Sequence, residues 1–284
     1  MHRWASTATK TNPSASTSPL GTVGIWRLTQ LLHAGQWCDL YAAQPADAAG
    51  SPRSDYAVKI TRQSSQAAPE AARQVRMEAT VAAAARHQHL IPVLDHQLNS
   101  SRPYIVMPRI AGAPLTLLLE RSSQPLPVAL WWTRQSAQAV AALHTAGYAH
   151  CDLKPDNLLI DDRGHLTVVD LGLAQRIGTP ADGDGSSAFR GTPRYAAPER
   201  LKDVAPPIDA AIDIYALGVV LQELLSTAQP SLPGLDELVA SMLSCDVEAR
   251  PSAKQLVETL LRLEIETLHH HIRPDGDVFR RQAA

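Results

Sequence analysis

The pattern of apolar residues changes near Gly112 and Pro114, and this change constrains the possible folds more than any other feature of the chain. Before it, short apolar runs separated by Gly, Pro and polar residues favour strands. These runs cover residues 25–28, 38–41, 56–60, 91–98 and 104–107. Between the third and fourth runs, the Ala-rich segment 69–86 predicts a helix, with Pro69 in its first turn. We therefore expect the first part of the chain to form a small antiparallel β-sheet lobe with one helix.

Beyond this point the helical period dominates. Residues 127–144 predict a helix that ends before Gly147, and residues 212–225 are apolar on nearly every face, which indicates a buried helix. Ser252 is placed to cap a last amphipathic helix. Two short apolar runs within residues 158–169 flank a polar turn and predict a hairpin. The second lobe should be larger and mainly α-helical, which makes the fold class α+β.

The ends of the chain and the joint between the lobes also have distinct compositions. Residues 1–22 are rich in Ser, Thr, Ala and Pro, and they offer too little apolar surface for burial to offset the entropy of ordering. We expect them to be a disordered tail. The other expected boundaries are 23–107 for the small lobe, 108–112 for a hinge, 113–265 for the large lobe and 266–284 for a C-terminal tail.

Composition excludes several classes of function. The formal charge of −2 over 284 residues gives no basic surface for nucleic acid. The three cysteines, Cys38, Cys151 and Cys245, are too few and too scattered for a disulfide framework or a zinc site, which favours a reducing, cytoplasmic location. No apolar run is long enough to span a bilayer, and no signal-peptide core follows the N-terminus, so we expect no membrane segment.

One eight-residue stretch, His150–Asn157, carries three complementary polar groups. Asp152 can accept a proton from a hydroxyl, Lys154 can neutralise charge on a moving phosphoryl group, and Asn157 can hold Mg²⁺ through its carbonyl oxygen. The stretch resembles the catalytic loop of protein kinases, whose pattern is H-R-D-L-x-x-x-N, except that Cys151 stands where the family usually has Arg.

Other motifs follow in the order that this family uses. Tyr56–Lys59 resembles the V-A-I-K strand, Asp170–Gly172 stands where the family has D-F-G, and Ala197–Glu199 matches A-P-E. A single motif of this kind would mean little, but their order over residues 25–265 makes coincidence improbable. The resemblance implies a two-lobed protein kinase fold that uses ATP and Mg²⁺, similar to the Ser/Thr type and to the eukaryotic-like kinases of bacteria.

The resemblance also assigns roles. Asp152 and Lys154 would act at the transferred group, and Lys59 would pair with the nucleotide phosphates and with Glu78. Asn157 and Asp170 are the implied metal ligands. The implied nucleotide-binding residues are Gly35, Leu40, Ala57, Lys59, Met107, Pro108, Ile110 and Leu159. Thr192 belongs to the implied substrate loop, and the implied structural residues are Asp213, Glu199 and Arg250.

Two departures from the pattern affect the expected behaviour. In the phosphate-covering loop, whose family pattern is G-x-G-x-x-G, only Gly35 remains, with His33 and Cys38 at the other two positions, so we expect weaker ATP affinity. Cys151 cannot bind a phosphate on the activation loop as Arg does. We therefore expect activation to be largely independent of phosphorylation there, and Ser186→Ala with Ser187→Ala to leave activity nearly intact.

Three functions remain open from the sequence. The leading one is a Ser/Thr protein kinase acting on Ser or Thr hydroxyls of a protein substrate, because Lys154 after the Asp is typical of that type. The second is a pseudokinase, a nucleotide-responsive binding module, which the altered phosphate loop favours. The third is a kinase of small molecules, which residues 191–199 argue against. Ala82, small where the family has a larger apolar residue, suggests a helix that a regulatory protein partner would stabilise.

Overall fold

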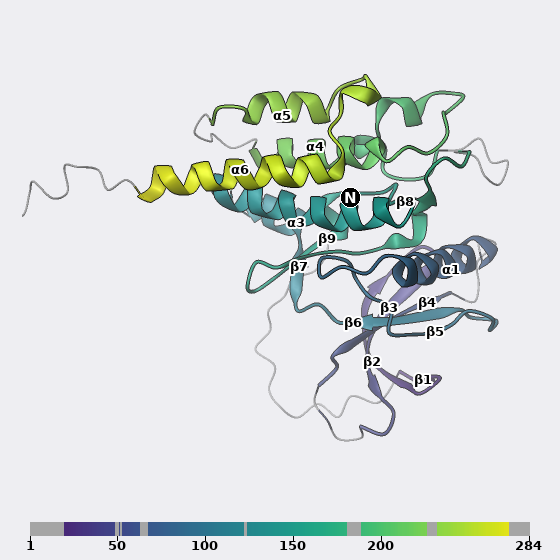
Figure 1. Ribbon diagram of the computed structural model, residues 1–284. Helices are drawn as coiled ribbons and strands as arrows, with labels where there is room; N and C mark the ends of the chain where they lie inside the picture. Colours follow the sequence, from purple (N-terminus) through teal and green to yellow (C-terminus); the bar gives the residue numbers. More distant parts are fainter. Residues whose placement is uncertain are drawn as a thin grey trace, which may run out of the picture.

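The computed structural model describes residues 20–48, 51, 53–62, 68–121, 124–180, 189–225 and 232–272, with side chains up to residue 267. Figure 1 shows two lobes, a sheet with one helix below and a group of helices above. The expected change of architecture therefore falls where the sequence placed it, close to Gly112. Ser186 and Ser187, and residues 1–19 of the expected N-terminal tail, lie outside the described residues.

The described part of the small lobe is built on a six-stranded antiparallel sheet with the strand order β1-β2-β3-β4-β6-β5. Its strands are β1 (Thr22–Val23), β2 (Trp26–Ala34), β3 (Cys38–Pro45), β4 (Tyr56–Thr61), β5 (Asp95–Gln97) and β6 (Tyr104–Pro108). The strand expected over 91–98 is shorter because its beginning has another partner. The N–H of Ile91 donates to the oxygen of Val168 in the large lobe, at 3.0 Å.

Helix α1 (Ala68–Ala84) lies between this sheet and the large lobe (Figure 1). Its Ala-rich sequence favours helix, and its apolar residues recur on one face. Val75 and Ala79 are buried against Ile105 and Met107 of β6 in one apolar cluster. The packing of small side chains therefore seats the helix closely on the sheet.

The large lobe contains the helices α2 (Leu115–Arg121), α3 (Leu126–Thr145), α4 (Ala211–Leu225), α5 (Leu235–Met242) and α6 (Ala253–Ile272). Gly147 follows α3 with a φ of 82°, a conformation that costs glycine little. As expected, α4 is buried over most of its surface, and Ser252 accepts a hydrogen bond from the N–H of Gln255 at the start of α6. α6 continues to Ile272, beyond the boundary expected at residue 265.

Short elements line the side of the large lobe that faces the sheet. The strands β7 (Gly112–Pro114), β9 (Leu158–Asp161) and β10 (Leu166–Val168) form a small sheet, and β8 (Tyr148–Ala149) pairs with β11 (Gln175–Arg176). The turns η1 (Pro155–Asn157) and η2 (Leu171–Leu173) belong to this side; the remaining described 3-10 turns of the lobe are η3 (Pro193–Tyr195), η4 (Pro198–Leu201) and η5 (Val247–Ala249), the last of which connects α5 to α6. These turns and strands carry the motifs 150–157 and 170–172.

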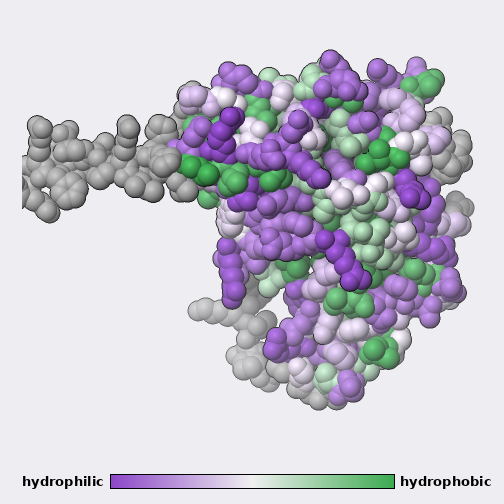
Figure 2. Space-filling model, in the orientation of Figure 1, coloured by the Kyte–Doolittle hydropathy of each residue, from purple (hydrophilic) through white to green (hydrophobic). Residues whose placement is uncertain are grey.

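The surface is mixed in character. Figure 2 shows hydrophilic and hydrophobic residues interspersed, with a green stretch over α6, the helix that carries the exposed Leu261 and Ile265. Single exposed apolar residues of this kind are ordinary in folded proteins. Among the helices within the described ranges, none combines the length and the apolar character that crossing a bilayer demands.

Candidate active site

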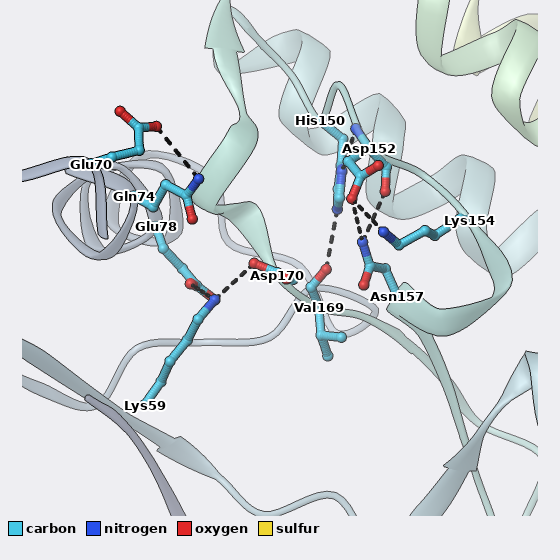
Figure 3. A network of polar contacts seen from close by, with 10 residues as sticks. All are labelled: Lys59, Glu70, Gln74, Glu78, His150, Asp152, Lys154, Asn157, Val169 and Asp170. Carbon is cyan, nitrogen blue, oxygen red and sulfur yellow. Dashed lines mark hydrogen bonds and ion pairs between the residues drawn. The ribbon is translucent and has the colours of Figure 1, made fainter. Parts of the chain in front are cut away.

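Lys59 lies at the centre of a charged group between the lobes (Figure 3). Its Nζ is 2.6 Å from Glu78 Oε2 of α1 and 2.7 Å from Asp170 Oδ1 of the large lobe. The Glu78 side chain is only 1% exposed, and that of Lys59 is 17% exposed. A lysine on a largely buried strand is costly unless opposite charges meet it, and here two carboxylates do.

These contacts favour the charged forms of Lys59 and Asp170, whereas burial raises the pKa of Glu78 in spite of Lys59 beside it. Lys59 lowers the pKa of Asp170 to about 2, against the opposing effect of burial. Burial by itself lowers the pKa of Lys59, but Asp170 and then Glu78 outweigh it, so that the pKa is raised above the usual lysine value. Lys59 and Asp170 are therefore charged at neutral pH, as the binding of phosphate and a metal cation requires.

A second polar group surrounds Asp152. Lys154 Nζ lies 2.8 Å from Asp152 Oδ2 and donates to Thr192 Oγ1, also at 2.8 Å. Thr192 in turn donates to Asp152 Oδ1 at 2.8 Å, so the three side chains form a closed ring. Asn157 Nδ2 donates to the main-chain oxygen of Asp152 at 2.9 Å. Every polar residue singled out in the stretch 150–157 thus converges on one carboxylate.

His150 holds two backbone groups near this carboxylate, the N–H of Asp152 and the oxygen of Val169. It is completely buried, and its Nδ1 accepts from the N–H of Asp152 at 3.3 Å. Because Nδ1 is an acceptor, the proton of the neutral ring is on Nε2, which donates to the oxygen of Val169 at 3.2 Å. His150 therefore joins the Asp152 loop to the residue preceding Asp170 (Figure 3).

Asp213, at the start of α4, binds the backbone of the same loop. Its two oxygens accept from the N–H groups of His150 at 2.8 Å and of Cys151 at 3.0 Å, and His144 Nε2 lies 2.9 Å from it. Burial by itself would raise the pKa of Asp213, but His144 and the backbone donors outweigh it and the pKa is lowered. The buried carboxylate is thus held ionised by its hydrogen bonds.

The site is also where the backbone is most unusual. Within the described residues, Cys151 and Asp170 are the two non-glycine residues with positive φ, at 67° and 64°. Side chains other than glycine adopt this conformation at a cost, which the surrounding structure must offset. The Asp213 contacts hold Cys151 there, and the ion pair with Lys59 holds Asp170.

The donor atoms near Asp170 are suited to Mg²⁺. The Asp170 side chain is half exposed, and only its Oδ1 is engaged by Lys59 in the contact described above. Because Asn157 Nδ2 is turned toward Asp152, its amide oxygen lies on the opposite side, away from Lys154 (Figure 3). Carboxylate and amide oxygens are the donors that Mg²⁺ prefers. In the part of the chain that is described, no cluster of three or more His, Cys, Asp or Glu side chains forms a ready-made metal site.

The expected adenine-binding residues lie on both lobes. Ala57 and Met107 are buried in one apolar cluster, with Leu40 and Ile110 packed against it. Leu159 is half-buried on β9, opposite Pro114 of β7, and is not a member of that cluster. Pro108 ends β6, and Arg109 donates its N–H to Asp55. Leu40, Ala57, Met107 and Ile110 therefore share one apolar cluster, while Leu159 lies on a strand of the small sheet in the large lobe.

The loop expected to cover the phosphates is a tight turn between β2 and β3. Gly35 donates its N–H to the oxygen of Cys38 at 3.0 Å, and a Cβ on Gly35 would lie 2.4 Å from that oxygen, so glycine is required here. The Cys38 thiol is near enough to Lys59 and Asp170 to be affected by their charges, and burial raises its pKa to about 11. Cys38 therefore presents a neutral thiol close to the charged group.

Arg62 holds this turn, a role that was not predicted from the sequence. Its N–H donates to the oxygen of Trp37 and its Nη1 to that of Gly35, both at 2.9 Å, and its Nε lies 3.3 Å from Asp39 Oδ1. Arg62 stands three positions after Lys59 and directly follows β4, where a charged residue is ordinary. A contact between neighbouring strands across a turn is not encoded in local spacing.

Glu199 and Arg250 form a buried ion pair in the large lobe. Arg250 Nη1 and Nη2 donate to the two carboxylate oxygens at 2.7 and 2.9 Å, and the Arg250 side chain is completely buried. Arg250 also donates to the oxygens of Ala211 and Ser244. The pair ties the segment after Thr192 to the beginning of α4 and to the loop before α6.

Comparison with known proteins agrees with this geometry. A family profile described as "Protein kinase domain" matches residues 49–233. The human serine/threonine-protein kinase ULK3 is 31% identical over 188 residues. The DNA damage-responsive serine/threonine-protein kinase RqkA of Deinococcus radiodurans is 34% identical over 157 residues, and the serine/threonine-protein kinase PknL of Mycobacterium tuberculosis is 33% identical over 156 residues. The chain belongs to the protein kinase domain family.

The coverage of these matches is partial. The alignments include 64%, 54% and 55% of this chain, and 39%, 23% and 38% of ULK3, RqkA and PknL, respectively. The chain thus spans well under half the length of these relatives. The two-lobed α+β fold and the family expected from the sequence are confirmed.

Proposed function

We propose that this chain is a Ser/Thr protein kinase that transfers the γ-phosphoryl group of MgATP to hydroxyl groups of proteins. The observation that carries the proposal is the convergence of four side chains, Lys59, Asp152, Asn157 and Asp170, from three separate parts of the sequence on one region between the lobes. Phosphoryl transfer depends mostly on positioning and on charge stabilisation, and this arrangement supplies both.

Asp152 is the proposed proton acceptor. Its carboxylate already accepts a hydroxyl hydrogen bond from Thr192, and a carboxylate has room for more than one such donor. Formation of the bond from the acceptor oxygen to the γ-phosphorus breaks the bond to the β–γ bridging oxygen, and that electron pair leaves with ADP. The hydroxyl proton passes to Asp152, and Lys154, 2.8 Å away, balances the charge of the transferred group.

The remaining polar residues hold the nucleotide and the metal. Lys59 would contact phosphate oxygens while Glu78 keeps its ammonium group in place. Asp170 and Asn157 would hold Mg²⁺, which when bound neutralises phosphate charge. Glu78 reaches Lys59 from α1, so the position of that helix decides whether the lysine is aligned. Residues 108–112 are the proposed hinge between a small lobe of residues 23–107 and a large lobe of residues 113–265.

Activation is proposed to be largely independent of phosphorylation of the activation loop. Burial raises the pKa of the Cys151 thiol, so the side chain is neutral where a phosphate-binding kinase would carry an arginine. The test is the double variant Ser186→Ala with Ser187→Ala, together with phosphatase treatment of the natural chain. Activity within about twofold of the untreated protein is expected. A large loss in either experiment would contradict this part of the proposal.

One experiment tests the proposed activity itself. Purified protein is incubated with γ-labelled ATP, Mg²⁺ and a general protein substrate, beside an Asp152→Asn variant. Label on Ser or Thr of the protein, absent from the variant, supports the proposal. A thermal shift with MgATP but no label would instead favour a pseudokinase, the alternative that the glycine-poor loop motivates. Label on a sugar or aminoglycoside alone would favour a small-molecule kinase.

The cellular setting is part of the proposal. The net charge of −2 and the scattered cysteines support a cytoplasmic enzyme with a protein substrate and no nucleic-acid partner. Ala82 is buried in the same cluster as Leu171, so the helix is packed there despite the small side chain. A regulatory protein partner is therefore proposed to change the rate only modestly, which comparison of the pure chain with and without cell extract would measure.

A further inference from the structure

One face of α1 carries polar residues at three successive turns: Glu70, Gln74 and Glu78. Residues spaced by four lie on the same side of a helix, one turn apart. Figure 3 shows the three side chains in a row along α1, with Glu78 at Lys59 and Glu70 farthest from it, joined to Gln74. The three residues contact described residues that lie between Asp170 and Thr192 in the sequence: Leu171 and Gly172 after Asp170, and Arg190 before Thr192.

Glu78 and Gln74, the two residues of this row nearest to Lys59, make close contacts with their neighbours. Glu78 binds Lys59 at 2.6 Å and also accepts a hydrogen bond from the N–H of Leu171. One turn earlier, Gln74 packs against Gly172, where an added Cβ would lie 3.3 Å from the Cβ of Gln74. The inner half of α1 is therefore fitted against residues 171–172, directly beside the proposed metal ligand.

Glu70, the residue of this row farthest from Lys59, forms an ion pair with Arg190. Arg190 Nη1 lies 3.1 Å from Glu70 Oε1, and 120 residues separate the two in the sequence. The Glu70 carboxylate is oriented within the helix by Arg73, whose Nε and Nη2 each donate to it at 3.0 Å. With 28% and 23% of the two side chains exposed, the Arg190–Glu70 pair is partly shielded from solvent.

Arg190 stands two residues before Thr192, whose hydroxyl joins Asp152 and Lys154. The ion pair thus links the helix that aligns Lys59 to the loop that surrounds Asp152. We propose that Glu70 and Arg190 are positioning residues, which hold α1 against the active site by a permanent ion pair. This inference rests on the proposed kinase activity and names how that activity is maintained without a phosphate.

The chemistry of the neighbouring residues explains why such a pair is useful here. The segment before Thr192 cannot be fixed by a phosphate bound to Cys151, because that thiol is neutral. The Glu70 carboxylate on α1 and the Arg190 guanidinium instead pair directly, with no phosphate between them. The link between the two parts of the site is then present as soon as the chain folds.

A double-mutant cycle tests the proposal. Glu70→Gln, Arg190→Gln and the double variant are compared for kcat and KM with MgATP. Each single variant is expected to lower kcat/KM about fivefold, and the double variant no further than either single one, because all three remove the same link. Arg134→Gln and Glu264→Gln are the matched controls, since this α3–α6 ion pair, at 2.6 Å, lies away from the site.

Two further measurements separate positioning from general stability. The natural chain at high salt should show the same loss of kcat/KM as the single variants Glu70→Gln and Arg190→Gln. These two variants should keep the melting temperature of the natural chain, whereas the control Arg134→Gln is expected to lower it. Hydrogen exchange of the α1 amides should become faster in Arg190→Gln and stay unchanged in Arg134→Gln. Equal exchange in both variants, or single effects that add in the double variant, would overturn the proposal.

The hydrogen-exchange result does not depend on catalysis, which keeps the two hypotheses distinguishable. A natural chain that neither transfers label nor binds MgATP would contradict the proposed function, while faster exchange in Arg190→Gln would still support the tether. Conversely, an active enzyme whose Arg190→Gln variant retains full activity and unchanged exchange would leave the function intact and refute the tether.

Discussion

Arg62 donates a hydrogen bond from Nη1 to the main-chain oxygen of Gly35, at 2.9 Å. Together with the Trp37 and Asp39 contacts, this bond fastens the turn between β2 and β3 to the end of β4. The turn stands where the kinase family covers the nucleotide phosphates with glycines. In this chain a side chain from the next strand therefore restrains a loop that has kept a single glycine of the pattern.

From this relationship we expect Arg62→Ala to weaken nucleotide binding. The KM for MgATP should rise about fivefold, with a small effect on kcat, because the variant frees the turn and leaves Lys59 and Asp152 unchanged. Arg102→Ala is the matched control: Arg102 donates to the oxygen of Thr61 at the same end of the sheet but does not contact the turn. An equal KM in both variants would show that the restraint is irrelevant to binding.

Replacing Cys38 by glycine should act in the opposite direction. Cys38 occupies the last glycine position of the phosphate loop, and its side chain lies close to the charged group. Cys38→Gly is expected to lower the KM for MgATP several-fold by letting the backbone approach the phosphates. The cost is about 0.5–1 kcal/mol of folding stability, because glycine is unfavourable in a strand. Cys245→Gly, at an exposed position, should leave the KM unchanged.

The Glu199–Arg250 pair is expected to dominate the stability of the large lobe. Arg250→Met should lower the free energy of unfolding by about 3–5 kcal/mol, because it leaves the buried Glu199 carboxylate without its partner. Urea denaturation followed by circular dichroism measures this change. The double variant Arg250→Met with Glu199→Leu should be considerably more stable than Arg250→Met alone. If the two are equally unstable, the loss comes from packing and not from the unpaired charge.

His89 should make the stability of the protein depend on pH. Its side chain is 4% exposed, its Nδ1 lies 2.7 Å from the oxygen of Leu166, and Gln88, His87 and His165 surround the ring. Burial lowers its pKa from 6.5 to about 4, outweighing the Leu166 contact, with smaller effects of the same sign from His165, His87 and Arg134. The folded state therefore favours the neutral ring.

The sign of the effect follows from these values. Between pH 6.5 and 4 the unfolded chain binds a proton that the folded chain does not, so stability is fully present above 6.5 and declines as the pH falls toward 4. The expected slope from His89 is up to about 1.4 kcal/mol per pH unit. Urea titrations at several pH values in this range measure the free energy of unfolding. Its dependence on pH should be weaker for His89→Asn and the same as in the natural chain for the exposed His96→Asn.

Much of the architecture could be predicted because it depends on local patterns. The helix at Ala68–Ala84 and the hairpin of β9 and β10 follow from helix propensity and from alternation around a polar turn. The residues from His150 to Asn157 were identified because their chemistry lies within one loop. Their convergence on Asp152 follows from that short spacing and from Thr192, which the family pattern pointed to.

The predictions were less accurate where the two lobes meet. The strand expected from Ile91 is shortened because Ile91 bonds to Val168 of the other lobe, and no local pattern shows which of two possible partners a backbone N–H takes. At the C-terminal end, helix α6 continues to Ile272, past the boundary of the large lobe expected at residue 265.

The sequence by itself determined the chemical groups, the elements that carry them and the family to which the chain belongs. Only the tertiary structure decided that Arg62 restrains the phosphate loop and that Arg190 reaches Glu70 across 120 residues. The reason is physical: charged side chains of this kind are common on any surface, and their partners are chosen by how the lobes and turns pack together. That packing depends on burial summed over the whole chain, which no short segment encodes.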